Sequence, residues 1–247
     1  IYGKFKMLKK IIKLQHKYLP IPLKIFQFIY SIKILSRVFI FYGYACFELD
    51  YASVEENYDD YWLSKRSMYW HYLHFTDTFL TDDFKTVFYT FPSLFKNKKI
   101  CDYGTGVGKI YNQFSKIPKM TMIEKNKYCC EFLKKKFNNY TIINGDYKAI
   151  KELEIDTLII TGGVLMYLSQ VEIDEFFENI KNIKNLVIIN EGADNDTFRD
   201  NDPSIMYDFK KRLKSNKYYA ESNFFICKKE KSYYKIFVMY QNFSTKD

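Results

Sequence analysis

The chain has 247 residues, 47% of them hydrophobic, which is enough for one large α/β domain or for a core with an added segment. Its five cysteines are odd in number and show no metal-type or disulfide-type spacing, and there are only three histidines. This usage offers no zinc site and favours a reducing, cytoplasmic location. The formal net charge of +9 comes entirely from the first 47 residues, which contain lysines and one arginine but no acidic residue.

Residues 7–18 alternate lysines with apolar residues at helical spacing and predict an amphipathic helix. After Pro20 and Pro22, a second helix is expected from residue 23 to about residue 47. No stretch of 18 residues is free of charge, which argues against a membrane span, and no signal peptide is expected. Three roles remain open for this basic segment: a helical cap packed on the core, peripheral contact with anionic lipid, or a platform for an anionic substrate or nucleic acid.

Residues 48–95 begin acidic and then become densely aromatic. They include the pattern Tyr58-x-x-Tyr61-Trp62, and His71 and His74 are spaced to share one helical face. Most of these side chains are expected to pack between helices, while Tyr61 and His74 are candidates for a catalytic base. The chain is therefore expected to divide into a helical N-terminal cap over residues 1–95 and an α/β core over residues 96–247.

A glycine-rich run is the most informative part of the chain. An apolar stretch ends at Asp102 and is followed by Gly104, Gly106 and Gly108 at alternate positions. Glycine is used where φ must be positive or where the backbone must closely approach a bound group. The run therefore predicts a buried strand that turns sharply into a helix around a ligand.

Acidic residues follow the next two apolar runs at regular distances. Glu124 comes 20 residues after Gly104, and Asp146 ends the third run; a fourth run, 157–161, leads into Gly162 and Gly163. In a nucleotide-type site, an acid at the tip of the second strand accepts hydrogen bonds from both ribose hydroxyls. An acid after the third strand could hold the amino group of adenine.

In these landmarks the sequence resembles the class I S-adenosylmethionine-dependent methyltransferases, over about residues 98–241. The pattern Asp102-x-Gly104-x-Gly106-x-Gly108 resembles their first motif, and it differs from the G-x-G-x-x-G that a nicotinamide cofactor requires. The resemblance implies a Rossmann-like, doubly wound, mostly parallel α/β sheet with an antiparallel C-terminal hairpin. It also implies S-adenosylmethionine as cofactor and S-adenosylhomocysteine as product.

The second half of the chain is expected to continue the alternation of strands and helices. Ser169 and Glu172 form a capping box that predicts a helix to about residue 183, followed by a strand at 185–190. A helix is expected around residues 204–213. Strands at 223–228 and 234–241 are then expected to form the final hairpin, because a short connection requires antiparallel pairing.

The resemblance implies specific site residues. The cofactor-binding residues it implies come from the ends of four strands: Asp102, Tyr103, Gly104, Thr105, Gly106, Gly108, Glu124, Gly145, Asp146, Gly162 and Gly163. The candidates for a base that accepts a proton from the acceptor are Tyr61, His74, Tyr167 and Glu191.

Motifs that the sequence lacks restrict the possible classes of methyl acceptor. No Asn/Asp-Pro-Pro-Tyr/Phe segment follows the fourth strand, as it does in enzymes that methylate base amines, and no Pro-Cys pair offers a nucleophile for pyrimidine carbon. A small molecule is therefore the leading acceptor class, methylated on oxygen, such as a sugar or a phosphorylated precursor of a surface saccharide. The alternatives are an RNA or lipid methyltransferase that docks through the basic segment, and a non-catalytic scaffold.

Overall fold

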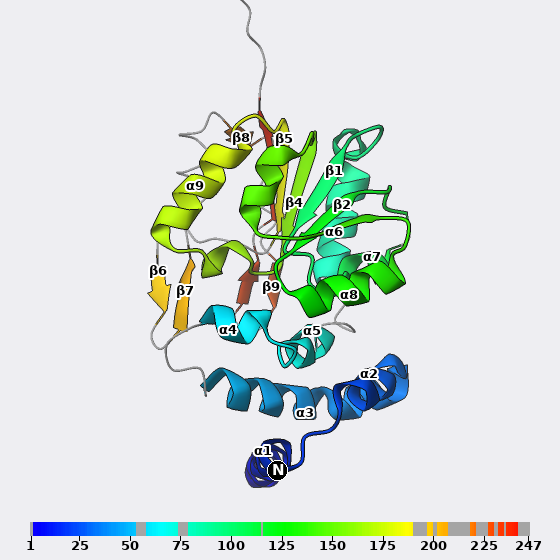
Figure 1. Cartoon of the computed structure of the whole chain (residues 1–247), viewed down its shortest axis with the longest axis vertical. Coiled ribbons are helices and arrows are strands. Elements are labelled where there is room, and N and C mark those ends of the chain that lie inside the picture. Colours follow the sequence, from blue (N-terminus) through cyan, green and yellow to red (C-terminus); the bar gives the residue numbers. More distant parts are fainter. Residues whose placement is uncertain are drawn as a thin grey trace, which may run out of the picture.

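A seven-stranded sheet lies at the centre of the computed structural model, with helices on both of its faces (Figure 1). The structure describes residues 2–52, 58–73, 79–114 and 116–189, and the strand segments 197–199, 202–206, 218–220, 227–229, 232–234 and 236–241. The strands run in the order β3-β2-β1-β4-β5-β11-β8. Their bounds are Ile100–Tyr103 (β1), Thr121–Glu124 (β2), Thr141–Asn144 (β3), Thr157–Thr161 (β4), Asn185–Ile189 (β5), Tyr218–Ala220 (β8) and Ile236–Gln241 (β11).

The first five strands are parallel, and their order reverses between β1 and β4. Open α/β sheets bind ligands outside the carboxyl ends of the strands at such a reversal. The register places Tyr103 beside Ile123 and Glu124 beside Asn144, so the ends of β1, β2 and β3 are neighbours. The mostly parallel, Rossmann-like sheet predicted from the sequence is confirmed.

Successive side chains of the strands point to opposite faces of the sheet and belong to two hydrophobic clusters. Cys101 and Tyr103 of β1 belong to one cluster with α9, and Ile100 belongs to the other with α6 and α7. A buried parallel strand needs apolar residues on both faces, which explains the continuous apolar runs of the sequence. The helices that cover the sheet are α6 (Phe79–Thr90), α7 (Lys109–Gln113), α8 (Lys127–Lys136) and α9 (Gln170–Ile180), with the 3-10 turns η2 (Pro92–Leu94), η3 (Tyr147–Glu152) and η4 (Leu165–Tyr167).

Five of the described helices come before α6 in the chain. They are α1 (Tyr2–Tyr18), α2 (Leu23–Ser31), α3 (Lys33–Ala52), α4 (Tyr58–Leu63) and α5 (Met68–Leu73). Helices α1–α3 form a layer at one end of the molecule, and α4 and α5 lie between this layer and the sheet (Figure 1). Buried Phe26, Cys46 and Met68 share a hydrophobic cluster with Cys129 of α8, so packing is continuous from the layer to the sheet. Over the ranges described, no helix is long and apolar enough to cross a membrane.

The side chain of Asn126 joins α8 to the turn between α4 and α5. Its Oδ1 accepts hydrogen bonds from the backbone N–H groups of Tyr128 and Cys129, which caps α8. Its Nδ2 donates to the carbonyl oxygens of Trp62 at 2.5 Å and Ser64 at 2.9 Å. One amide therefore fixes both the start of a helix and the position of the preceding aromatic segment.

Several sequence expectations are resolved by these elements. The capping box at Ser169 is present and opens α9 as predicted. The single helix expected over residues 23–47 is two helices, because Ile32 adopts an extended conformation (φ −88°, ψ 107°) that no proline or glycine marks.

The helix expected around residues 204–213 is wrong where it can be examined. Ser204 to Met206 belong to a strand, β7 (Asp202–Met206), which pairs with β6 (Thr197–Arg199). Asp202 precedes Pro203, and a residue before proline favours an extended backbone. Residues 207–213 lie outside the described residues.

The expected pairing of 223–228 with 234–241 is also replaced. Strand β11 pairs antiparallel with both β5 and β8, whereas β9 (Cys227–Lys229) pairs with β10 (Ser232–Tyr234). Residues 223–226 lie outside the described residues.

Candidate functional site

The glycine loop follows β1 and has a left-handed backbone at all three glycines. Gly104, Gly106 and Gly108 have φ values of +74°, +59° and +69°. The amide of Gly104 donates to the carbonyl of Ile123 at 2.9 Å, which holds the loop against the end of β2. A Cβ on Gly104 would lie 2.4 Å from Cγ2 of Val164, so the segment after β4 packs directly on the loop and requires glycine there.

Glu124, at the end of β2, binds the backbone of the glycine loop. Its Oε2 accepts a hydrogen bond from the amide of Gly106 at 2.7 Å, and its Oε1 accepts one from the amide of Asn126 at 2.8 Å. Burial raises the pKa of the Glu124 carboxyl, and these two backbone amides counteract the rise. The amide of Lys125 also donates to this carboxylate, and since a carboxylate has about four acceptor sites, Glu124 retains acceptor capacity for a further donor.

Asp102 is buried beneath the loop, with 1% of its surface exposed. Its Oδ1 has no hydrogen-bond partner among the described residues. Burial raises the pKa of Asp102 to about 7, and the neighbouring side chains of Tyr111 and Thr105 offset part of the rise. A carboxyl in this position is poised between its neutral and its charged form near neutral pH.

The ends of β3 and β4 complete the edge of the sheet. The amide of Gly145 donates to the carbonyl of Glu124 at 3.1 Å, which joins β3 to β2. Asp146 is half-buried and caps η3 by accepting a hydrogen bond from the amide of Lys148 at 2.8 Å. Gly162 and Gly163 after β4 both have positive φ, at +84° and +81°.

An aromatic group from α4, α5 and η4 lies over the glycine loop. The ring centroid of Trp62 is 5.1 Å from that of Tyr167 and 6.0 Å from that of His71. Nδ1 of His71 lies 3.1 Å from the position that a Cβ on Gly106 would occupy. The imidazole and the two aromatic rings are thus placed beside the loop that Glu124 holds.

The structure brings many of the predicted site residues together but separates others. Tyr103 packs against Phe176 with ring centroids 6.0 Å apart, so its side chain belongs to the core and only its backbone adjoins the loop. The Thr105 hydroxyl donates to the Asp102 carbonyl at 3.2 Å, which shapes the loop. Tyr61 is buried, and its ring packs against Phe47 of α3 at 5.8 Å.

Of the candidate bases, Tyr167 and Tyr61 each have a ring centroid 5.1 Å from that of Trp62; His74 and Glu191 lie outside the described residues. Trp62, His71 and Val164 were not among the predicted site residues, although the sequence pattern singled out Trp62 and His71. Trp62 follows Tyr61 directly, and local spacing cannot distinguish which of the two rings packs against His71 and Tyr167. His71 could have been found only through its distance from Gly106, which depends on the path of the chain between α4 and α5.

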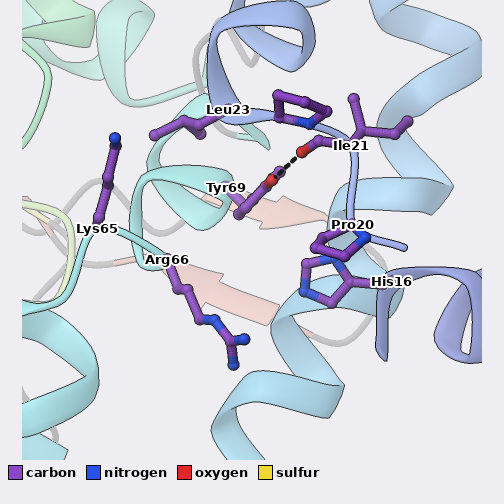
Figure 2. Close-up of a pocket in the computed structure, with 8 residues that line it drawn as sticks. His16, Pro20, Ile21, Leu23, Lys65, Arg66 and Tyr69 are labelled. Atoms are coloured by element: carbon purple, nitrogen blue, oxygen red, sulfur yellow. Dashed lines mark hydrogen bonds between the residues drawn. The ribbon is translucent and has the colours of Figure 1, made fainter. Parts of the chain in front are cut away.

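A separate cavity of about 230 Å³ lies away from this edge (Figure 2). It is lined by His16, Lys65, Arg66, Tyr69 and residues 20–23, where α1 and α2 meet the turn before α5. Its lining comes from the N-terminal helices and not from the strand ends, so it is distinct from the glycine loop.

Comparison with known proteins supports the fold. No family model matches the sequence, and no curated protein matches it. Among solved structures, magnesium protoporphyrin IX methyltransferase from Synechocystis, crystallised with bound SAH, is similar with a TM-score of 0.53 and 14% identity, over 85% of this chain and 99% of that chain. The chain has the class I methyltransferase fold.

A second structure with this fold is a SAM-dependent methyltransferase from Leishmania major, with a TM-score of 0.56 and 15% identity over 78% of this chain and 90% of that chain. The sequence identities are low, so what this chain shares with these two proteins is the architecture of the fold. Activity must be argued from the residues of this chain.

Proposed function

We propose that this chain is an S-adenosylmethionine-dependent methyltransferase. The observation that carries the proposal is the buried Glu124 carboxylate at the end of β2, hydrogen-bonded to the amide of Gly106. The residues fit the cofactor: the loop backbone needs glycine at each alternate position, and Glu124 keeps an acceptor site for a ribose hydroxyl. The Synechocystis neighbour was crystallised with SAM and with SAH, in line with this choice.

Each residue has a separate task in this proposal. Glu124 binds the ribose, and Asp146 binds the adenine amino group with the carboxylate oxygen that does not cap η3. The loop from Gly104 to Gly108 holds the methionine part; Asp102 orders that loop or meets the ammonium group, and Gly162 and Gly163 lie near the sulfonium. The cofactor supplies a methyl group on a sulfonium, which is an excellent leaving group. The protein must orient the acceptor and exclude water.

The aromatic group supports a small acceptor with a hydroxyl. Trp62, His71 and Tyr167 offer flat apolar surfaces together with one imidazole, a combination suited to a sugar or a phosphorylated sugar precursor. In this role His71 accepts the hydroxyl proton, since its Nδ1 lies 3.1 Å from the position that a Cβ on Gly106 would occupy. We therefore propose O-methylation of a small metabolite.

Calorimetric titration with S-adenosylhomocysteine tests the cofactor site. The wild-type chain is expected to bind, and Glu124→Gln is expected to weaken binding about 100-fold, because hydrogen bonds to a charged group contribute about 1.5–3 kcal/mol each. The matched control is Glu131→Gln, an exposed glutamate on α8. Absence of wild-type binding, or equal affinity of the Glu124 variant with an unchanged melting temperature, would contradict the proposal.

A lipid acceptor is the second candidate, favoured by the exposed apolar and basic side chains of α1 and α2. Incubation with methyl-labelled cofactor and a cell extract, followed by partition between water and organic solvent, separates the two candidates. Label in the aqueous small-molecule fraction supports the sugar acceptor. Label in the organic phase supports the lipid, and label in precipitated RNA argues against both.

A further inference from the structure

The N-terminal layer exposes an unusual share of the apolar surface. Eleven of the thirteen large apolar side chains that are exposed among the described residues lie between Met7 and Phe41, so exposure is concentrated in α1–α3. Concentrated apolar exposure marks a surface that binds a partner or a membrane. The same layer contains most of the chain's excess positive charge, because its nine lysine and arginine residues face only two acids, Glu48 and Asp50.

Helix α1 has two different sides. Ile12 and His16 face inward, since Ile12 packs on the cluster with Phe26 and Tyr42, and His16 is 4% exposed. Met7, Ile11, Leu14 and Tyr18 follow one another at intervals of four, three and four residues, which places them in one stripe along the helix. They are 50–73% exposed, so this stripe points away from the protein.

Lysines flank this stripe. Lys6, Lys10 and Lys17 of α1 are exposed, whereas Lys9 and Lys13 pair with Glu48 of α3 and hold α1 in place. Helix α2 repeats the arrangement with exposed Ile25 (51%) and Phe28 (67%) beside exposed Lys24. Helix α1 lies at the end of the molecule farthest from the sheet, where a flat surface can reach it (Figure 1).

We propose that the stripe of α1, with the exposed side of α2, binds the surface of an anionic lipid bilayer. Apolar side chains enter the interface between headgroups and acyl chains, and flanking lysines pair with anionic headgroups. Nucleic acid would use the lysines but would leave Met7, Ile11 and Leu14 in water. Face-to-face pairing of two copies would bring two positively charged layers together.

Co-sedimentation of the full chain with vesicles tests this proposal without any dependence on cofactor binding. Binding is expected to phosphatidylcholine vesicles that contain phosphatidylglycerol, and to be much weaker with phosphatidylcholine alone. The double variant Ile11→Gln/Leu14→Gln is expected to lose most of the binding. Its matched control is Tyr89→Gln/Val171→Gln, which changes two exposed apolar residues that lie outside the layer in the described part of the chain.

Charge is tested in parallel with Lys10→Gln/Lys17→Gln, which is expected to weaken vesicle partitioning about fivefold for each lysine removed. The control replaces Lys134 and Lys135, which are exposed on α8. Circular dichroism shows whether each variant is folded; all of the changed positions are on the surface.

Three results would overturn the proposal. The first is a folded wild-type chain that does not sediment with anionic vesicles, or a stripe variant that sediments as well as wild type. The second is tight binding to polyuridylate that depends on the lysines and not on the stripe. The third is a wild-type dimer that becomes monomeric in the stripe variant while vesicle binding is absent in both.

Discussion

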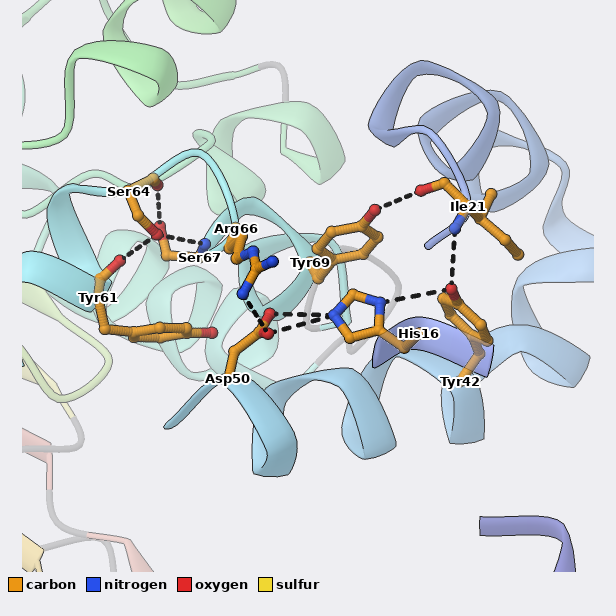
Figure 3. A network of polar contacts seen from close by, with 9 residues as sticks. All are labelled: His16, Ile21, Tyr42, Asp50, Tyr61, Ser64, Arg66, Ser67 and Tyr69. Carbon is orange, nitrogen blue, oxygen red and sulfur yellow. Dashed lines mark hydrogen bonds and ion pairs between the residues drawn. The ribbon is translucent and has the colours of Figure 1, made fainter. Parts of the chain in front are cut away.

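Two buried acids, one at the edge of the sheet and one in the N-terminal layer, are stabilised in different ways. Glu124 accepts hydrogen bonds from backbone amides of its own and the adjacent strand end. Asp50 of α3 accepts them from side chains: His16 Nε2 at 3.2 Å and an Arg66 guanidinium nitrogen at 3.3 Å (Figure 3). The backbone leaves Glu124 able to accept a further donor, whereas the hydrogen bonds of Asp50 join α1, α3 and the turn before α5.

The network around Asp50 extends on both sides. His16 Nδ1 lies 3.5 Å from the hydroxyl of Tyr42, which accepts a hydrogen bond from the amide of Ile21. The hydroxyl of Tyr69 donates to the carbonyl of Ile21. These contacts satisfy the backbone of the link between α1 and α2, and they show that buried charge in this layer has a structural role. The comparison suggests that a buried acid held by amides marks a binding edge, and it can be tested in both regions.

The largest expected effect concerns Asp102, a third buried acid, whose Oδ1 has no hydrogen-bond partner among the described residues. Its folded-state pKa of about 7 lies above the ordinary value of 3.8, so the folded state binds a proton that the unfolded state has released. Stability is therefore expected to fall as pH rises from 4 to 7, by as much as about 4 kcal/mol. Urea unfolding across this range checks it: Asp102→Asn should flatten the profile and Asp60→Asn, at an exposed position, should not. An unchanged slope in Asp102→Asn would refute the prediction.

Replacing Asp50 with alanine should destabilise the fold by about 3 kcal/mol, because it leaves buried His16 without its carboxylate partner. Glu48→Ala is the control on the same helix: its ion pairs with Lys9 and Lys13 are partly exposed, and surface pairs contribute at most about 1 kcal/mol. Chemical denaturation measures both. S-adenosylhomocysteine affinity should stay unchanged in folded Asp50→Ala; a loss would show that the two regions are coupled.

A smaller effect, about 2 kcal/mol, is expected for Gly104→Ala, since the new Cβ would meet Val164 at 2.4 Å in a left-handed backbone. Gly145→Ala is the matched control at the same edge, where the nearest atom is 3.4 Å away. Adding Val164→Ala should recover part of the loss, because it removes the clash and leaves the backbone strain. Equal melting temperatures for the two single variants would mean that the loop tolerates a side chain.

The sheet edge could be predicted because its signals are local. Asp102, the alternate glycines and Glu124 each follow an apolar run directly, and parallel strands bring such positions together. The positive φ of the glycines follows from the same pattern. The strand end that carries Asp146 was found in this way as well.

The remaining features depend on contacts between distant residues. His16 and Asp50 are 34 positions apart, and nothing in the spacing of either reveals the other. Whether Trp62 or Tyr61 packs against His71 and Tyr167 depends on how α4 and α5 are oriented against α3 and α8. These helices have six residues each, and the orientation of such short helices is determined by packing and not by helix propensity. The strand at Ser204 was missed because a local pattern outweighed the effect of Pro203 on its neighbour.

The double role of Asn126 has a consequence for chemical ageing. Deamidation to aspartate would keep the oxygen that accepts from Tyr128 and Cys129, so α8 would still begin at the same residue. The hydrogens given to the carbonyls of Trp62 and Ser64 would be lost, and two oxygen atoms would face a negative charge. Loss of the Asn126 side-chain nitrogen would thus release the segment that carries Trp62 from α8, while the sheet would stay intact.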